Sequence, residues 1–226
     1  MRILLLGHGR MGQLVESLAS SYGATIAGVI DERSGERAIA EGKYGPVDVA
    51  IDFTLADAVV KNLPQLAERK INVVIGTTGW GAQEASLRAI ADKAGIGVLA
   101  AANFSLGMNV FQLAVEEASR HFANHAEFGA WIHESHHVMK KDAPSGTALS
   151  LKSGMQQAGY ARPIDVSSTR AGSVPGTHTV GFDGPSETIA FTHAVRDRAV
   201  FARGALTAAQ WLVGKQGWFS IRDLLL

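Results

Sequence analysis

Cysteine is absent from this 226-residue sequence, and so is net charge. Without a thiol the chain can form no disulfide, no thiolate zinc site and no cysteine nucleophile. Lys and Arg together number 21 and are balanced by 21 Asp and Glu. A general nucleic-acid-binding protein needs a basic excess to displace counterions from phosphates, so no nucleic-acid partner is expected.

Long hydrophobic runs are absent as well. No stretch approaches the roughly 20 apolar residues that span a bilayer, and the first apolar run stops at Gly7, too early for a signal peptide. We therefore expect a soluble, cytoplasmic protein with no membrane partner. Hydrophobic residues make up 46% and charged residues 19%, which favours a well-buried core.

The first hundred residues alternate between short apolar runs and segments with helical spacing. The runs are rich in Val and Ile, as in parallel strands covered on both faces, and they predict strands at 2–6, 25–30, 47–51, 71–75 and 96–99. Helices are predicted at 11–21, 56–69 and 83–94, with at most a short helix within 34–44. Strand and helix in alternation indicate an α/β domain of the Rossmann type, with a parallel sheet and right-handed crossovers.

The pattern changes after about residue 103. Helices are predicted at 107–122, 147–158 and 199–213, strands at 127–133, 165–169, 178–182 and 188–192, and a short apolar tail at 221–226. We expect residues 1–103 plus 200–226 to form a dinucleotide-binding domain. Residues 104–199 would form an α+β domain for substrate binding and oligomerisation, whose open mixed sheet has a face to bury.

A glycine-rich motif follows the first predicted strand and opens the first helix. It is Gly7-His8-Gly9-Arg10-Met11-Gly12, a GxGxxG sequence in the setting that binds dinucleotides. Gly7 permits the tight turn, Gly9 lets the backbone approach the pyrophosphate, and Gly12 lets the helix pack closely. The free N–H groups at the helix start would then bind phosphates.

Asp31 lies 19 residues beyond Gly12, at the end of the second predicted strand. A carboxylate there binds the adenosine ribose hydroxyls and favours NADH, because it repels a 2′-phosphate. Arg33 could bind that phosphate instead, whereas Glu32 adds a second negative charge. The cofactor is therefore NADH, NADPH or both, with a slight preference for NADH.

Two further loops follow later strands, at the sheet edge where ligands bind in open α/β folds. They are Gly76-Thr77-Thr78-Gly79 and Ala101-Ala102-Asn103-Phe104-Ser105. Small residues and hydroxyls suit a ribose and a nicotinamide lying over backbone. Each loop taken singly is equally consistent with a simple turn.

The densest chemistry lies in residues 134–148, with the sequence ESHHVMKKDAPSGTA. His136, His137 and Lys140 can donate protons or bind carboxylates. The turn Ser145-Gly146-Thr147 precedes a helix, whose first N–H groups would bind a carboxylate.

Residues 133–137 also satisfy HExxH, the pattern of zinc proteases. That pattern binds zinc only on a helix, where residues four apart lie about 6 Å from each other. Here the preceding residues predict a strand, which would separate His133 and His137 by roughly 13 Å. We therefore expect no metal, although the histidines could also merely end a strand.

Residues 134–148 resemble the signature of the dihydrodipicolinate reductase family, E-x-H-H-x-x-K-x-D-x-P-S-G-T-A, without a gap. The GxGxxG loop, Asp52-Phe53-Thr54, and the loops at 76–79 and 103–105 resemble that family in the same order. The likeness continues to the end of the chain. The stretch between Asp31 and Asp52 is shorter than in the commoner form of the family, so the adenine-side contacts do not carry over.

The resemblance implies reduction of a small cyclic dicarboxylate, 4-hydroxy-tetrahydrodipicolinate (dihydrodipicolinate), to tetrahydrodipicolinate in lysine and diaminopimelate biosynthesis. By position in the signature, His136 is the general acid and Lys140 a second proton donor and carboxylate anchor. The other substrate-binding residues it implies are His137, Ser145, Gly146, Thr147 and Arg198. It also implies a homotetramer, and cofactor contacts from Gly7, His8, Gly9, Arg10, Met11, Gly12, Asp31, Arg33, Phe53, Gly76, Thr77, Thr78, Ala102, Asn103 and Phe104.

Two alternatives have the same cofactor domain. One is a Rossmann-type oxidoreductase of another amino-acid pathway, against which the Ser-Gly-Thr turn beside His136 and Lys140 argues. The other is a non-catalytic protein that senses NADH, which would need a docking or DNA-binding module. The sequence has no basic recognition helix to supply one.

Overall fold

The computed structural model describes residues 1–34 and 37–226, which fall into two compact units. The first unit comprises Met1–Leu106 and Ala199–Leu226, and the second comprises Gly107–Arg198. In the described part of the chain no helix is long and apolar enough to cross a membrane.

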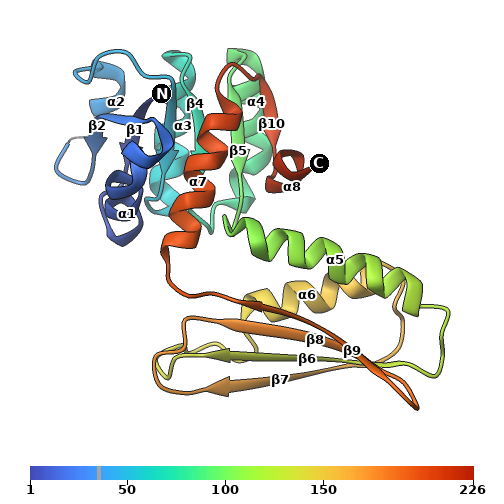
Figure 1. Cartoon of the computed structure of the whole chain (residues 1–226). Coiled ribbons are helices and arrows are strands. Elements are labelled where there is room, and N and C mark those ends of the chain that lie inside the picture. Colours follow the sequence, from blue (N-terminus) through green and yellow to red (C-terminus); the bar gives the residue numbers. More distant parts are fainter. Residues whose placement is uncertain (35–36) are drawn as a thin grey trace. The chain divides into compact units, whose positions relative to one another are not determined.

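The first unit is built on a six-stranded sheet in the order β10-β5-β4-β3-β1-β2, with every pair parallel. Its strands are β1 (Arg2–Leu6), β2 (Thr25–Ile30), β3 (Val49–Asp52), β4 (Asn72–Ile75), β5 (Gly97–Ala100) and β10 (Gly217–Phe219). Its helices are α1 (Arg10–Ala19), α2 (Ala38–Glu41), α3 (Ala56–Glu68), α4 (Glu84–Ala94), α7 (Ala199–Leu212) and α8 (Ile221–Leu225), with short 3-10 turns at Ser20–Tyr22 and Gly81–Gln83. This sheet confirms the predicted Rossmann-type class (Figure 1).

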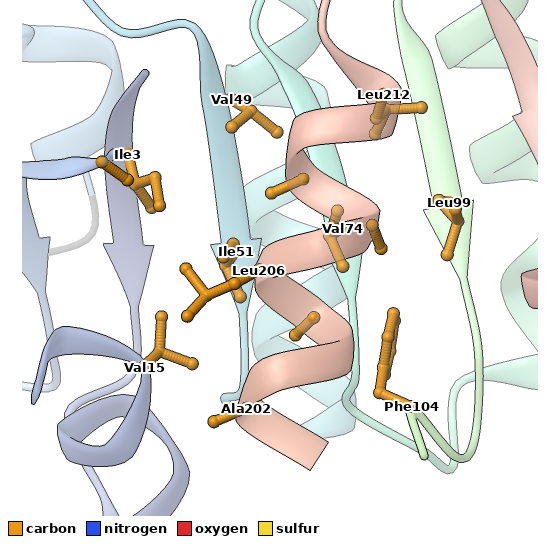
Figure 2. Close-up of a cluster of buried hydrophobic side chains, with 14 of the residues drawn as sticks. Ile3, Val15, Val49, Ile51, Val74, Leu99, Phe104, Ala202, Leu206 and Leu212 are labelled. Atoms are coloured by element: carbon orange, nitrogen blue, oxygen red, sulfur yellow. The ribbon is translucent and has the colours of Figure 1, made fainter. Parts of the chain in front are cut away.

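Both faces of this sheet are buried, as the unbroken apolar runs predict. On one face, residues such as Ile3, Ile51 and Val74 pack against α1 and α7 (Figure 2). On the other face, the alternate strand residues, such as Leu4 and Val73, pack against α3 and α4. Period-two alternation thus gives each strand two apolar faces.

The second unit has a four-stranded sheet in the order β7-β6-β8-β9. It contains α5 (Leu106–Phe122), β6 (Gly129–His136), α6 (Gly146–Gln157), β7 (Ile164–Arg170), β8 (Thr177–Asp183) and β9 (Thr188–Ala194). Strand β6 runs parallel to β7 and antiparallel to β8, so the sheet is mixed, as expected. Helices α5 and α6 contribute to one core with inward residues such as Ile132 and Val180.

The structure differs from the sequence prediction in three elements. The apolar tail predicted at 221–226 is a short helix, α8, which begins after a capping box formed by Ser220 and Asp223. Strand β10 was not predicted, because a Gly-Trp-Phe segment has no periodicity of its own and becomes a strand by pairing with β5. Strand β6 was predicted to end at residue 133 but continues to His136. Glu134 and His136 break the apolar pattern there, yet both are buried. The first four residues of the zinc-protease pattern at 133–137 lie on this strand and none lies on a helix, so its two histidines do not share a helix face.

Candidate active site

The loop between β1 and α1 has the shape that the glycine motif predicts. Gly7 has a φ of +85°, which favours glycine, and its N–H donates to the Ile30 carbonyl at 2.8 Å. A Cβ on Gly12 would lie 2.1 Å from the Gly7 carbonyl oxygen, so only glycine permits this close packing. At Gly9, the N-cap of α1, a Cβ would meet nothing within 4 Å. The start of α1 therefore has open space for an anionic group.

This loop lies where the strand order reverses, between β1 and its neighbour β3. Ligands bind at such switch points in open α/β sheets. A cavity of about 820 Å³ is found there. Its lining includes six of the residues predicted to bind cofactor: Gly7, His8, Gly9, Asp31, Arg33 and Phe53.

Asp31 and Arg33, which were predicted to favour different cofactors, are paired with each other. Arg33 donates to Asp31 Oδ2 from Nη2 at 2.8 Å and from Nε at 3.1 Å. The side chain of Arg33 is 83% exposed and that of Asp31 is 20% exposed. The hydrogen bonds from Arg33 lower the pKa of Asp31. A ribose that binds Asp31 therefore meets the guanidinium as well.

Asp52, at the end of β3, is a residue whose function the sequence did not reveal. Its carboxylate is buried and accepts hydrogen bonds from Thr54 N at 2.9 Å, Thr77 Oγ1 at 3.0 Å and Asn62 Nδ2 at 3.0 Å. The loops after β3 and β4 are thereby tied to one side chain. Buried carboxylates are hydrogen-bonded in folded proteins, and here the hydrogen bonds of Asp52 hold the two loops together.

A second hollow, of about 490 Å³, lies at the carboxyl ends of β4 and β5 and contains Thr77, Thr78 and Ala102. In the described chain, six other predicted cofactor residues line neither hollow: Arg10, Met11, Gly12, Gly76, Asn103 and Phe104. Two of these residues, Gly76 and Phe104, have packing roles instead. A Cβ on Gly76 would lie 2.1 Å from the Phe53 ring, and the buried Phe104 contacts Phe53 edge-on at 6.2 Å between ring centroids.

In the second unit, Glu134 and His136 lie on the same face of β6, because side chains two residues apart point the same way. Both are buried, and His136 Nδ1 hydrogen-bonds Glu134 Oε2. Burial lowers the pKa of His136, although the hydrogen bond that Nδ1 donates to Glu134 opposes the shift. When Nδ1 donates to the carboxylate, Nε2 is left as the nitrogen for proton transfer.

Arg170, at the end of β7, is the second partner of Glu134. Its Nη2 donates to Glu134 Oε1 at 2.8 Å, and Ser145 N donates to the same oxygen at 3.3 Å. Burial alone would raise the pKa of Glu134, but hydrogen bonds from Arg170, Ser168 and His136 outweigh it and lower the pKa to about 2. The carboxylate is thus ionised behind His136.

The turn at residues 145–147 forms the start of α6. Ser145 is the N-cap, and its hydroxyl accepts from Ala148 N at 3.2 Å. The same hydroxyl lies 3.2 Å from Nε2 of His178, a buried histidine whose pKa burial lowers to about 4. A Cβ on Gly146 would meet nothing within 4 Å, so the helix start is open to a carboxylate.

The remaining predicted residues have fewer contacts. Lys140 Nζ donates to Asp142 Oδ1 at 2.8 Å, and that hydrogen bond lowers the pKa of Asp142. His137 is half-buried at the end of β6, and Arg198 is exposed at the last position of its unit. Nothing in these contacts assigns either residue to a substrate.

One group in the described residues has metal-ligand geometry, with atoms of Glu134, His136 and His178 within 4.8 Å of one another. The oxygens of Glu134 already accept from His136 and Arg170. A cation there would displace these hydrogen bonds and face the guanidinium charge, so we assign no metal to this group.

Comparison with known proteins gives the same family at both ends of the chain. The family model for the N-terminus of dihydrodipicolinate reductase matches residues 1–104, and that for its C-terminus matches residues 107–225. A 4-hydroxy-tetrahydrodipicolinate reductase of Stenotrophomonas maltophilia is 40% identical over 100% of this chain and 98% of its own length. A protein of the same name from Christiangramia forsetii is 34% identical over 100% of this chain and 98% of its own.

A solved structure shows the same fold. The dipicolinate-bound dihydrodipicolinate reductase of Paenisporosarcina sp. TG-14 superposes with a TM-score of 0.84 at 19% identity, covering 100% of this chain and 99% of that one. Together with the two family models, these similarities establish that the chain belongs to the dihydrodipicolinate reductase family.

Proposed function

We propose that this protein is an NAD(P)H-dependent reductase that converts 4-hydroxy-tetrahydrodipicolinate to tetrahydrodipicolinate in lysine and diaminopimelate biosynthesis. The observation that carries this proposal is the family signature folded around a buried pair, with Glu134 behind His136 and the open start of α6 tied to the same carboxylate. This arrangement argues against an oxidoreductase of another amino-acid pathway with the same cofactor domain.

The glycine loop and its cavity fit a pyridine dinucleotide, which supplies a hydride when bound. The N–H groups at the start of α1 would bind the pyrophosphate, and Asp31 the adenosine ribose. We propose that both NADH and NADPH serve, with NADH slightly favoured. Asp31 and Glu32 oppose a 2′-phosphate, whereas Arg33 can leave Asp31 to bind it.

Substrate roles follow from the contacts of each side chain. His136 donates a proton from Nε2 while Glu134 holds Nδ1. The N–H groups of Gly146 and Thr147 bind one substrate carboxylate, and Lys140, released from Asp142, binds a carboxylate and supplies a second proton donor. His137, Ser145 and Arg198 are proposed as further substrate-binding residues on the family pattern.

The first unit would be the dinucleotide-binding domain and the second the substrate-binding domain. We also propose that the protein is cytoplasmic and that it forms a homotetramer through the open sheet. The open face of that sheet, opposite α5 and α6, is where copies of the chain would meet.

The test is a coupled assay. Dihydrodipicolinate synthase generates the substrate from pyruvate and aspartate semialdehyde, and the absorbance of NADH, then NADPH, is followed. We expect rapid oxidation with wild-type protein and a loss of about 10²- to 10⁴-fold with His136→Gln, the range for a general acid. His121→Gln is the matched control, because His121 is exposed on α5 and pairs with Glu117.

Oxidation of neither cofactor, by protein shown to bind both, would overturn the proposal and favour a different substrate or a cofactor sensor. Full activity of His136→Gln would overturn the role of that residue while leaving the reaction intact.

A further inference from the structure

Arg170 connects two parts of the candidate site that are distant in the sequence. It is the last residue of β7 and lies opposite His136 in the parallel pairing of β6 and β7. Its Nη2 donates to Glu134 Oε1 at 2.8 Å and also to the backbone carbonyl of Asp142. One guanidinium nitrogen therefore bonds both Glu134, on the strand that carries His136, and the loop that follows this strand.

Glu134 in turn bonds two further groups of the candidate site. Its Oε2 accepts from His136 Nδ1, and its Oε1 accepts from Ser145 N, the N-cap residue of α6. The Glu134 side chain is 0% exposed and that of Arg170 is 17% exposed. A carboxylate so deeply buried needs a cationic partner, and a buried ion pair of this kind gives specific geometry more than stability.

We propose that Arg170 is a positioning residue: its guanidinium holds the Glu134 carboxylate behind His136 and, through the Asp142 carbonyl, the loop that carries Lys140. Both proposed proton donors then depend on one side chain. This inference rests on the proposed function, since it concerns the groups that donate protons in that reaction.

Geometry explains why this position suits arginine. Its Nη1 donates to the Thr169 carbonyl at 2.8 Å while Nη2 donates to the Glu134 carboxylate and the Asp142 carbonyl, so the rigid guanidinium plane is fixed through two nitrogens. Lysine would keep the charge but not the planar arrangement. On the other side of the imidazole, Gly176 leaves room, since a Cβ there would lie 3.1 Å from His136 Nε2. Nδ1 is thus fixed by Glu134 and Nε2 stays clear of side chains from this position.

The charged and titratable groups around His136 are Glu134 on β6, Lys140 in the following loop, Arg170 on β7 and His178 on β8. His193 on β9 lowers the pKa of His178. Glu134 raises the pKa of His136, whereas Arg170 and Lys140 lower it. The hydrogen bond and charge of Glu134 raise the pKa of His136 more than the charge of Arg170 lowers it. If Arg170 positions Glu134, its removal weakens that larger effect, so the titration of His136 should shift to lower pH in variants that lack either residue. If Arg170 acted only through its charge, its removal would shift the titration of His136 to higher pH.

The experiment compares Glu134→Gln, Arg170→Gln and Arg170→Lys with wild type, in the pH dependence of kcat and in the ¹⁵N shifts of His136. Its resonances are assigned by their loss in His136→Gln. We expect kcat to fall about 10- to 100-fold in Glu134→Gln and Arg170→Gln, as when groups that orient a functional histidine are removed. The descending limb of the pH profile, which reports loss of the His136 proton, should move to lower pH in both Glu134→Gln and Arg170→Gln.

Arg170→Lys should keep the limb near its wild-type position and restore part of kcat, because it keeps the charge. Arg120→Gln and Glu117→Gln are matched controls, since these residues form an exposed ion pair on α5. If Arg170→Gln does not fold, Arg170→Lys decides the question: a kcat below that of wild type supports the inference, and a wild-type kcat contradicts it. Wild-type titration of His136 in folded Arg170→Gln, or a shift to higher pH in that variant, would overturn the inference.

The two proposals fail in different ways. Wild-type protein that oxidises no cofactor with this substrate contradicts the proposed function, whatever the spectra show. Active wild-type protein in which the variants leave kcat and the His136 spectra unchanged contradicts only the role of Arg170.

Discussion

At the scale of single residues, His136 combines two requirements that oppose each other. A general acid must be protonated, but burial lowers the pKa of this imidazole below its usual value of 6.5. The Glu134 carboxylate opposes the shift without removing it. A substrate with two carboxylates adds negative charge near the ring, which favours the imidazolium. Binding of the substrate would thus help to protonate its own proton donor.

This argument predicts different pH profiles for two kinetic constants. As pH rises, kcat/KM should fall through a pKa below 6.5, because it reports the free enzyme. The limb of kcat should lie at higher pH, because it reports the complex with a dianion. Initial rates in the coupled assay between pH 5 and 9 measure both. Coincident limbs, or a limb that persists in His136→Gln, would contradict the assignment.

Arg33 is the residue on which the choice between cofactors should depend. Its guanidinium is 83% exposed and bound to Asp31, and an exposed ion pair of this kind is weak, so Arg33 can leave it to bind a 2′-phosphate. Arg33→Ala should raise the KM for NADPH about 10- to 100-fold, the equivalent of losing a charged hydrogen bond, and change that for NADH little. Asp31→Asn should have the opposite effect, with a higher KM for NADH and little change in that for NADPH. Equal effects of Arg33→Ala on both cofactors would show that Arg33 does not contact the phosphate.

At the scale of secondary structure, the sequence was informative wherever a pattern was local. The first five strands of the parallel sheet were found because their apolar runs are buried on both faces. The end of β6 was missed because Glu134 and His136 are polar, and their burial depends on partners elsewhere in the chain. Strand β10 depends on β5 in the same way. Contacts between distant segments leave no periodic signal.

The same distinction holds for the candidate site. The glycine loop and residues 134–148 were identified because each is a contiguous motif. Arg170 is 36 residues from Glu134, and no pattern connects them. Asp52 belongs to a family-like segment, but its three hydrogen-bond partners come together only in the fold. Groups that position other groups are therefore the ones that the sequence does not reveal.

Gly204 illustrates a packing requirement within an element. It lies in α7, where alanine would normally stabilise a helix by about 0.5–1 kcal/mol. However, a Cβ there would lie 1.7 Å from the Phe104 carbonyl oxygen, in the region where α7 packs against the sheet (Figure 2). Gly204→Ala should therefore lower the free energy of unfolding, by about 1–3 kcal/mol.

Urea denaturation followed by tryptophan fluorescence would measure this change, because Trp80, Trp211 and Trp218 all lie in the first unit. Gly81→Ala is the control, since a Cβ there would meet nothing within 4 Å, and it should change stability by less than about 0.5 kcal/mol. A Gly204→Ala protein as stable as wild type would show that α7 can move away from Phe104 at no cost.

At the scale of the whole molecule, the two units differ in how their sheets are covered. The six-stranded sheet is buried on both faces, whereas the four-stranded sheet has its core on the side of α5 and α6. The opposite face presents polar side chains, among them His133, Ser167, Thr179 and Thr192, together with Trp131, whose ring lies over Gly181. A sheet face with aligned hydroxyls and one aromatic side chain can pack against a second copy of itself through hydrogen bonds and apolar contact.

The proposed homotetramer makes this face a testable interface. Light scattering after size exclusion should give about four times the 23.9 kDa of one chain. Thr179 lies on β8 with its hydroxyl 3.1 Å from that of Thr192 on β9, so Thr179→Arg would place a charge on the face and should reduce the mass. Ser153→Arg is the control, because Ser153 is exposed on α6. If Thr179→Arg keeps the wild-type mass, the copies meet elsewhere; if wild type is monomeric, the open face has no second copy to cover it.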